Sequence, residues 1–102
     1  MSHWVRVAAA ADIPEGSGKE VVTEGQIIAL YHSEGQFWAL DGVCPHAGGP
    51  LANGKLNGPI VTCPWHGWQF DIQTGRHCLN PNLTQPRFAV KVEGADLWVE
   101  LP

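Results

Sequence analysis

The stretch that decides the fold is residues 44–70. It opens with Cys44-Pro45-His46-Ala47-Gly48-Gly49-Pro50-Leu51 and closes with Cys63-Pro64-Trp65-His66-Gly67-Trp68-Gln69-Phe70. Four of its side chains are strong metal ligands, and they form two mixed pairs, Cys44 with His46 and Cys63 with His66. Glycine and proline surround each pair, so each pair belongs on a tight loop rather than on a helix. Two such loops can enclose one inorganic centre from opposite sides.

Two kinds of centre accept this donor set. One is a tetrahedral zinc site, although zinc modules usually pair Cys with Cys and His with His at longer spacings. The other is a [2Fe-2S] cluster in which two Cys hold one iron and two His hold the other. The mixed pairs favour the iron–sulfur cluster, and zinc is the alternative.

The two boxes resemble, in order and in separation, the two cluster-binding boxes of Rieske proteins. A proline after each cysteine and glycines after each histidine agree with that family, as do the four ligands. The resemblance implies one Rieske-type [2Fe-2S] cluster, with Cys44, His46, Cys63 and His66 as its cofactor-binding and metal-binding residues. Two neutral imidazoles leave such a cluster less negative than four thiolates, which raises its reduction potential to a range of roughly −150 to +300 mV. We expect a one-electron carrier with no catalytic residue.

Outside the two boxes the pattern predicts strands joined by turns, without a helical period. We expect strands at residues 4–8, 21–23, 27–32, 37–40, 60–62, 68–72, 88–92 and 97–101. Ile28 and Leu30 should share one face, and Phe88, Val90 and Val92 should face the apolar residues of the last strand. The predicted fold class is all-β: a Rieske-type antiparallel β-sandwich base with an inserted two-loop cluster-binding subdomain. We expect one domain over residues 1–102, with that subdomain at about 42–72.

Composition limits the function further. At 102 residues, with 44% hydrophobic and 16% charged residues, the chain reads as one small globular domain. A formal net charge of −4 argues against nucleic acid as a partner. The chain has no apolar run of the roughly 20 residues that a membrane helix needs, and no signal segment at its start. Two of three cysteines belong to the predicted centre, so the third leaves no disulfide framework and a cytoplasmic location is expected.

The resemblance also separates two types of Rieske protein. High-potential members carry a cystine between the loops, and a Ser and a Tyr near the second His. Here Gly49 and Trp65 stand at the cystine positions, Trp68 at the Ser position and Phe70 at the Tyr position. Hydroxyl donors to the cluster sulfurs raise the potential, so their absence implies the low-potential ferredoxin type.

Three functions are compatible with the resemblance. The first is a ferredoxin that carries electrons from a flavin-containing reductase to the terminal oxygenase of a ring-hydroxylating dioxygenase system. The second is the small Rieske subunit of a larger reductase, such as assimilatory nitrite reductase. The third, the oxygenase itself, would need a second domain with its own iron site, for which the chain has no room. The first is preferred; the oligomeric state, the downstream substrate and the identity of the partners stay open.

The remaining features have simpler interpretations. Cys78 is expected to be a structural thiol, and His3, His32 and His77 are expected to be ordinary polar residues. Residues 79–87 should form an ordered loop beside the cluster. Pro45, Pro50, Pro64 and Trp65 could form an apolar docking tip or could only shape the loops. Trp68 and Phe70 are interpreted as core aromatics. The acidic residues of the first third are interpreted as a solvated face, with steering of a basic reductase as the alternative.

Overall fold

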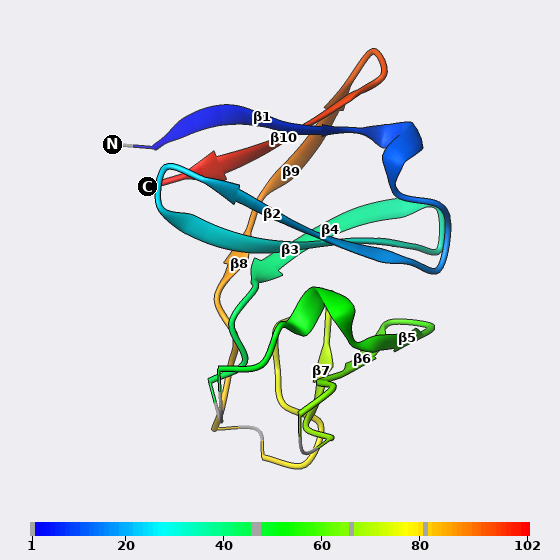
Figure 1. The fold of residues 1–102 in the computed structure, drawn as a ribbon, viewed down its shortest axis with the longest axis vertical. Helices are drawn as coiled ribbons and strands as arrows, with labels where there is room; N and C mark the ends of the chain where they lie inside the picture. The colour runs from blue at the N-terminus through cyan, green and yellow to red at the C-terminus, as the bar shows by residue number, and fades with distance from the viewer. Residues whose placement is uncertain (1, 46–47, 66, 81) are drawn as a thin grey trace.

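Three antiparallel sheets make up the described part of the protein (Figure 1). The structure is a computed structural model that describes residues 2–45, 48–65, 67–80 and 82–102. The first sheet has the strand order β1 (His3–Ala9), β10 (Asp96–Leu101), β9 (Val90–Glu93). The second has the order β2 (Gly18–Thr23), β3 (Gln26–Ser33), β4 (Gln36–Asp41), β8 (Arg87–Phe88). These two sheets form the base, and the predicted all-β class is confirmed.

The third sheet is small and lies below the base in Figure 1. It contains β5 (Lys55–Asn57), β6 (Ile60–Thr62) and β7 (Gln69–Asp71), in that order. Two short 3-10 turns complete the secondary structure, η1 (Ala10–Asp12) before β2 and η2 (Leu51–Asn53) before β5. We call residues 42–86, which contain this sheet and its loops, the loop end.

Strand β3 is the centre of the packing, because it is buried on both faces. Ile28 and Leu30 point into a core shared with Leu97 and Val99 of β10. Ala29 and Tyr31 point the other way, into a second core that contains Cys44 and Cys63. The predicted apolar pair on one face is confirmed, but the opposite face is equally buried because the small sheet covers it. Burying an aliphatic side chain of this kind contributes about 1.5–3 kcal/mol.

The turn between β3 and β4 sets the register of this central hairpin. Glu34 has a φ of 55° and Gly35 a φ of 74°, so both central residues take the left-handed conformation that a type I′ turn requires. Ser33 pairs with Gln36 directly across the turn. The Glu15 carboxylate accepts hydrogen bonds from the Glu34 and Gly35 N–H groups, each at 2.9 Å. The strands predicted at residues 27–32 and 37–40 are confirmed as the two arms of this hairpin.

The strand expected at residues 88–92 is wrong in one respect, because the chain changes sheets at Ala89. Phe88 pairs with Ala39 of β4, whereas Val90 pairs with Val99 of β10. Phe88 and Val90 pack on the base core as expected, but Val92 is 50% exposed. It lies near the end of β9, where no described layer covers it.

Candidate functional site

The two candidate cysteines come together between the base and the small sheet. Cys44 follows β4 through Gly42 and Val43, and Cys63 directly follows β6. Each is 1% exposed, and the two share one core with Phe70 and Tyr31. Their thiols lie close enough for Cys44 to raise the pKa of Cys63. Two residues 19 positions apart in the sequence therefore present their sulfur atoms to one buried point.

Backbone hydrogen bonds close each cysteine loop at its base. The Cys44 N–H donates to the Gly49 carbonyl at 2.9 Å, and Val43 and Pro50 form an isolated antiparallel bridge. The Cys63 N–H donates to the Trp68 carbonyl at 2.7 Å. The second loop is thus the connection of the β6–β7 hairpin. Tight loops at these positions are what the surrounding glycines and prolines predict.

Gly49 brings the two loops into contact. A Cβ at this position would lie 3.0 Å from Cys63 Sγ and 3.0 Å from Trp65 Cγ. Any side chain here would press on the second cysteine, so glycine gives the sulfur room. Positions 49 and 65, which the Rieske resemblance matches to a loop-bridging cystine, are therefore neighbours in space.

The chemistry of this pair fits a metal centre. Burial raises the pKa of the Cys63 thiol, and the nearby Cys44 adds to that shift, while a hydrogen bond from the Trp65 backbone N–H acts in the opposite direction. Two thiolates this close in a dry site repel each other unless a cation lies between them. Iron bound by both sulfurs would supply that positive charge. The residues present therefore fit the thiolate half of a [2Fe-2S] cluster.

The two predicted histidine ligands, His46 and His66, lie outside the described residues. Among the residues that the structure describes, no group of three or more His, Cys, Asp or Glu side chains could hold a metal ion. The assignment of all four ligands thus stays a prediction, of which the structure brings together the two cysteines.

Gln85 is a residue near the site that the sequence did not reveal. It is 2% exposed, and its Nε2 donates to the Asp41 carbonyl at 2.7 Å and to the Val43 carbonyl at 2.6 Å. The side chain therefore attaches the segment after β7 to the backbone just before Cys44. An isolated glutamine in a loop carries no pattern that would have identified it. The ordered loop predicted at 79–87 does lie beside the first cysteine loop.

His77 organises the same segment from the other side. Its Nδ1 accepts the N–H groups of Leu79 and Asn80, both at 3.1 Å, so the ring carries its proton on Nε2 when it is neutral. The ring is buried against the edges of Trp68 and Phe70, with centroids 4.8 and 5.2 Å away. Nε2 has no hydrogen-bond partner among the described residues. His77 is thus a positioning residue for the turn that follows it.

Tyr31 lies beside the cysteines but does not offer them its proton. Its hydroxyl donates to the Leu51 carbonyl at 2.9 Å. Burial, with a smaller effect from Cys63, raises its pKa above the usual value. Phe70, fully buried in the same core, has no hydroxyl. The interpretation of Phe70 as a core aromatic is confirmed, and Trp68 packs half-buried against this core.

The expectation for the third cysteine is wrong. Cys78 is exposed rather than packed, although its backbone N–H donates to the Gln69 carbonyl. His32 and His3 behave as expected: His32 Nδ1 lies 2.8 Å from the Ile13 carbonyl, and His3 Nε2 pairs with Glu24 at 2.8 Å.

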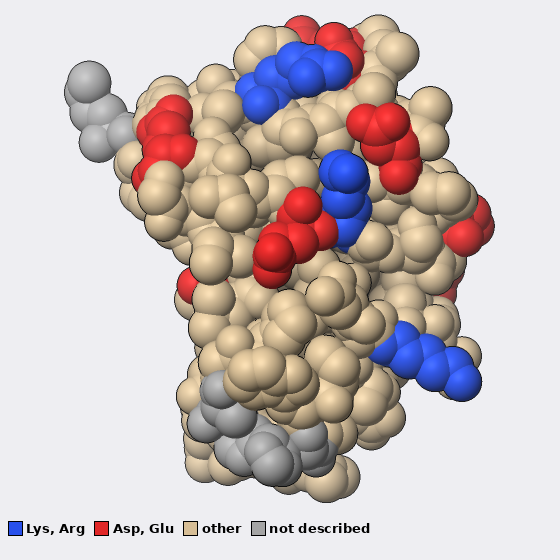
Figure 2. Space-filling view, viewed as in Figure 1, with Lys and Arg blue, Asp and Glu red and all other residues tan. Residues whose placement is uncertain are grey.

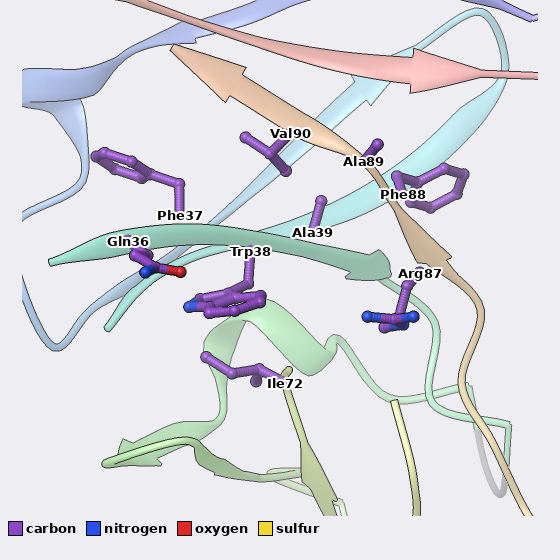
Figure 3. Close-up of a pocket in the computed structure, with 9 residues that line it drawn as sticks. All are labelled: Gln36, Phe37, Trp38, Ala39, Ile72, Arg87, Phe88, Ala89 and Val90. Atoms are coloured by element: carbon purple, nitrogen blue, oxygen red, sulfur yellow. The ribbon is translucent and has the colours of Figure 1, made fainter. Parts of the chain in front are cut away.

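A depression of about 240 Å³ on the base is a separate feature (Figure 3). It forms where β8 leaves the edge of β4, with Trp38 and Ile72 on one side and Phe37 and Val90 on the other. Neither Cys44 nor Cys63, the two predicted ligands that the structure describes, lines it. No helix in the described part of the chain is long and apolar enough to cross a membrane.

Comparisons with known proteins agree with this geometry. The sequence model of the Rieske [2Fe-2S] domain matches residues 3–95. The ferredoxin component of the naphthalene 1,2-dioxygenase system of Pseudomonas aeruginosa is 37% identical, over 96% of this chain and 95% of that protein. The p-cumate 2,3-dioxygenase ferredoxin component of Pseudomonas putida is 36% identical, over 99% of this chain and 88% of that one.

Solved structures give the same result. A chain in the complex of reduced oxygenase and oxidised ferredoxin of carbazole 1,9a-dioxygenase superposes with a TM-score of 0.86 and 32% identity. That match covers 94% of this chain and 91% of the other. A Mycobacterium tuberculosis protein named as a candidate small subunit of an NADH-dependent nitrite reductase has a TM-score of 0.90 at 20% identity, over 100% and 97% of the two chains, and shows the fold alone. The paired buried cysteines, the loops around them and the match over residues 3–95 lead to one conclusion: the chain belongs to the Rieske [2Fe-2S] domain family and carries one Rieske-type [2Fe-2S] cluster.

Proposed function

We propose that this protein is a one-electron carrier, a Rieske-type ferredoxin that passes electrons from a flavin-containing reductase to the terminal oxygenase of a ring-hydroxylating dioxygenase system. One observation carries the proposal: the match to ferredoxin components of dioxygenase systems extends over nearly the whole of both chains. The oxygenase as acceptor is supported by the structural likeness to a chain of the carbazole ferredoxin–oxygenase complex. The flavin reductase as donor is inferred from the relatives' membership of multicomponent systems.

Cys44 and Cys63 would hold one iron of the cluster, and His46 and His66 the other. When bound, the cluster supplies reversible one-electron transfer, so the chain itself needs no acid, base or nucleophile. The two cysteines, each 1% exposed, exclude water from the thiolate side. Gly49 leaves room beside Cys63, and Gln85 with His77 keeps the two neighbouring segments in place.

We place the protein in the low-potential type. Phe70 offers no hydroxyl near the cysteines, and the Tyr31 hydroxyl is already bonded to Leu51. A donor that is absent or already engaged cannot stabilise added charge on sulfur. We also infer that residues 1–102 act as one domain with its cluster-binding part at about 42–72, and that the protein works in the cytoplasm.

A small subunit of a nitrite reductase is the second candidate. The likeness to such a protein is high in fold but only 20% in sequence, against 37% for the naphthalene ferredoxin component. A permanent large subunit would copurify with the native protein, whereas a ferredoxin would be isolated on its own.

The test is an electron paramagnetic resonance spectrum of the dithionite-reduced protein, with iron and acid-labile sulfide measured on the same sample. A rhombic signal of low average g, with equal iron and sulfide, is expected. The reduced protein should then lose its electron to the terminal oxygenase of a naphthalene or p-cumate system. A silent spectrum with bound zinc would replace the electron carrier by a small β-domain with a structural metal.

Replacing His66 by Cys tests the ligand assignment. A thiolate adds negative charge to the outer iron, so the midpoint potential of His66→Cys should fall. An unchanged or higher midpoint in a variant with full iron content would contradict the role of His66.

A further inference from the structure

Charge is distributed very unevenly over the molecule. Nine of the ten acidic residues lie in the base, residues 1–41 and 87–102, together with four of the six basic ones. The runs 42–54, 56–70 and 77–86 contain no Asp, Glu, Lys or Arg at all. On the face that Figure 2 shows, red and blue atoms gather on the base, and the opposite end is tan apart from one basic side chain at its flank and the grey residues. The base therefore has a formal charge of −5, and the end that holds the cysteines has a formal charge of +1.

The uncharged end is also where large apolar side chains are exposed. Leu79 is 88% exposed, Trp65 49% and Val43 40%. Val43 precedes Cys44, Trp65 lies two residues beyond Cys63, and Leu79 borders a groove of about 330 Å³ that Trp68 and Leu83 also line. Exposed apolar groups that gather beside a functional site are typical of an interaction surface.

The exposure of Leu79 is imposed by the local hydrogen bonds. The N–H groups of Leu79 and Asn80 donate to His77 Nδ1, the Leu83 N–H donates to the Asn80 carbonyl, and the His77 N–H donates to the Leu83 carbonyl. This turn is anchored by a buried ring, so its outer residue is held out into solvent. A leucine that is presented in a fixed position loses little conformational entropy when a partner covers it.

We propose that this end docks into an uncharged, apolar recess of the terminal oxygenase, the acceptor proposed above, with Leu79 as its principal anchor and with little contribution from electrostatic steering. The inference rests on the proposed function and specifies the partner's surface. Charge complementarity supports it. A charged group on the partner would lose its water on docking here and would find no opposite charge in return, so an uncharged partner surface fits better. The molecule is 36 Å along its longest axis, several times the Debye length of about 8 Å at physiological ionic strength. Salt therefore screens the acidic base from a partner at the opposite end.

The charge part of the proposal can be measured with two inorganic oxidants of opposite sign. The reduced protein is mixed in a stopped-flow instrument with ferricyanide or with tris(1,10-phenanthroline)cobalt(III), from about 100 mM to about 500 mM ionic strength, where the Debye length is about 10 Å or less. Each rate is expected to change less than about twofold, because the local charge at the electron-transfer end is near zero. A rise for the anion and a fall for the cation, each of about tenfold or more, would show that the whole-molecule charge governs the reaction and would overturn the proposal.

A matched pair of variants locates the effect. Leu79→Asp and Val22→Asp each add one negative charge at an exposed apolar position, the first at the loop end and the second on β2 of the base, where Val22 is 66% exposed. Leu79→Asp should make both oxidation rates depend on salt, in opposite directions, and Val22→Asp should not. Equal salt dependence in the two variants would show that electron transfer does not take place at the loop end.

The apolar part is tested by electron self-exchange between oxidised and reduced copies, followed by broadening of paramagnetic NMR signals. A second copy presents the same uncharged apolar end and so serves as a probe of known chemistry. Leu79→Asn should slow self-exchange by about tenfold, whereas Val22→Asn should leave it unchanged. An unchanged rate in Leu79→Asn would remove Leu79 as the anchor. A protein without any reducible cluster would instead disprove the proposed function, so the two failures are distinguishable.

Discussion

The base and the loop end use different means to hold their structure. The base consists of antiparallel strands of up to eight residues, with β3 buried on both faces, and it carries nine of the ten acidic residues. The loop end has strands of only three residues, yet it contains seven of the twelve glycines and six of the eight prolines. Its order comes from turns and from single polar side chains that bond to the backbone, such as Gln85 and His77.

The difference shows how this chain separates stability from function. Long antiparallel strands bury a regular core and leave their outer face to charged groups, which keep the protein in solution. A site that binds a cluster and meets a partner needs tight loops and an uncharged surface, which a regular sheet cannot provide. The loop end is therefore expected to be more sensitive to single substitutions than the base.

The largest expected effect is loss of the cluster. Cys63→Ser should remove essentially all bound iron and sulfide, because a hydroxyl is a poor ligand for this iron and the site is too dry for water to replace it. Cys78→Ser is the matched control and should retain both iron and sulfide, since Cys78 is exposed and is not one of the predicted ligands. Iron and sulfide contents per chain decide the matter, and equal losses in the two variants would refute the distinction.

A smaller but still large effect is expected at Gly75. Its φ of 79° and the Gln85 carbonyl, which occupies the place of a Cβ, make Gly75→Ala both strained and overpacked. We expect the free energy of unfolding of Gly75→Ala to be about 4 kcal/mol lower than that of the unchanged protein. Gly16→Ala, with a φ of 83° and nothing within 4 Å of its Cβ position, isolates the backbone strain and should cost about 1 kcal/mol. If denaturant titrations gave the two variants similar losses of unfolding free energy, overpacking against the Gln85 carbonyl would not be the cause of the larger loss.

Gln85→Leu tests the attachment between the two regions. It removes the donor that the carbonyls of Asp41 and Val43 share, at an expected cost of about 1–2 kcal/mol. Hydrogen exchange should accelerate in the first cysteine loop and remain slow in β3. If exchange accelerated equally in both places, the base would not be independent of this contact.

The smallest effect concerns the charges of the base. Hydrogen bonds from the Gly35 and Glu34 N–H groups, with a contribution from His32, hold the pKa of Glu15 below 4.5. A carboxylate with a lowered pKa contributes stability that is complete above its unfolded value and disappears as the pH falls through its folded one. An NMR titration should find this lowered pKa, and Glu15→Gln should weaken the acid dependence of the β3–β4 turn. A pKa at or above 4.5 would contradict the turn contact.

Much of the molecule could be predicted from the sequence. Alternation of apolar residues identifies strands locally, so the all-β class and most strand positions followed from the pattern. Errors arose where tertiary context decides: the change of sheet at Ala89 and the exposure of Val92 and Cys78 depend on which layer covers each residue.

The cluster family and its four candidate ligands were determined by the sequence alone, because ligand chemistry depends on residue type and short spacing. Only the tertiary structure decided that Cys44 and Cys63 meet in one dry core, that Gly49 leaves them room, and that Gln85 and His77 hold the surrounding loops. It also exposed Leu79 at the loop end, away from the base that carries nine of the ten acidic residues. Contacts such as that of Gln85 with Val43 leave no local pattern, because the two partners lie 42 residues apart and are joined only by the packing of the fold.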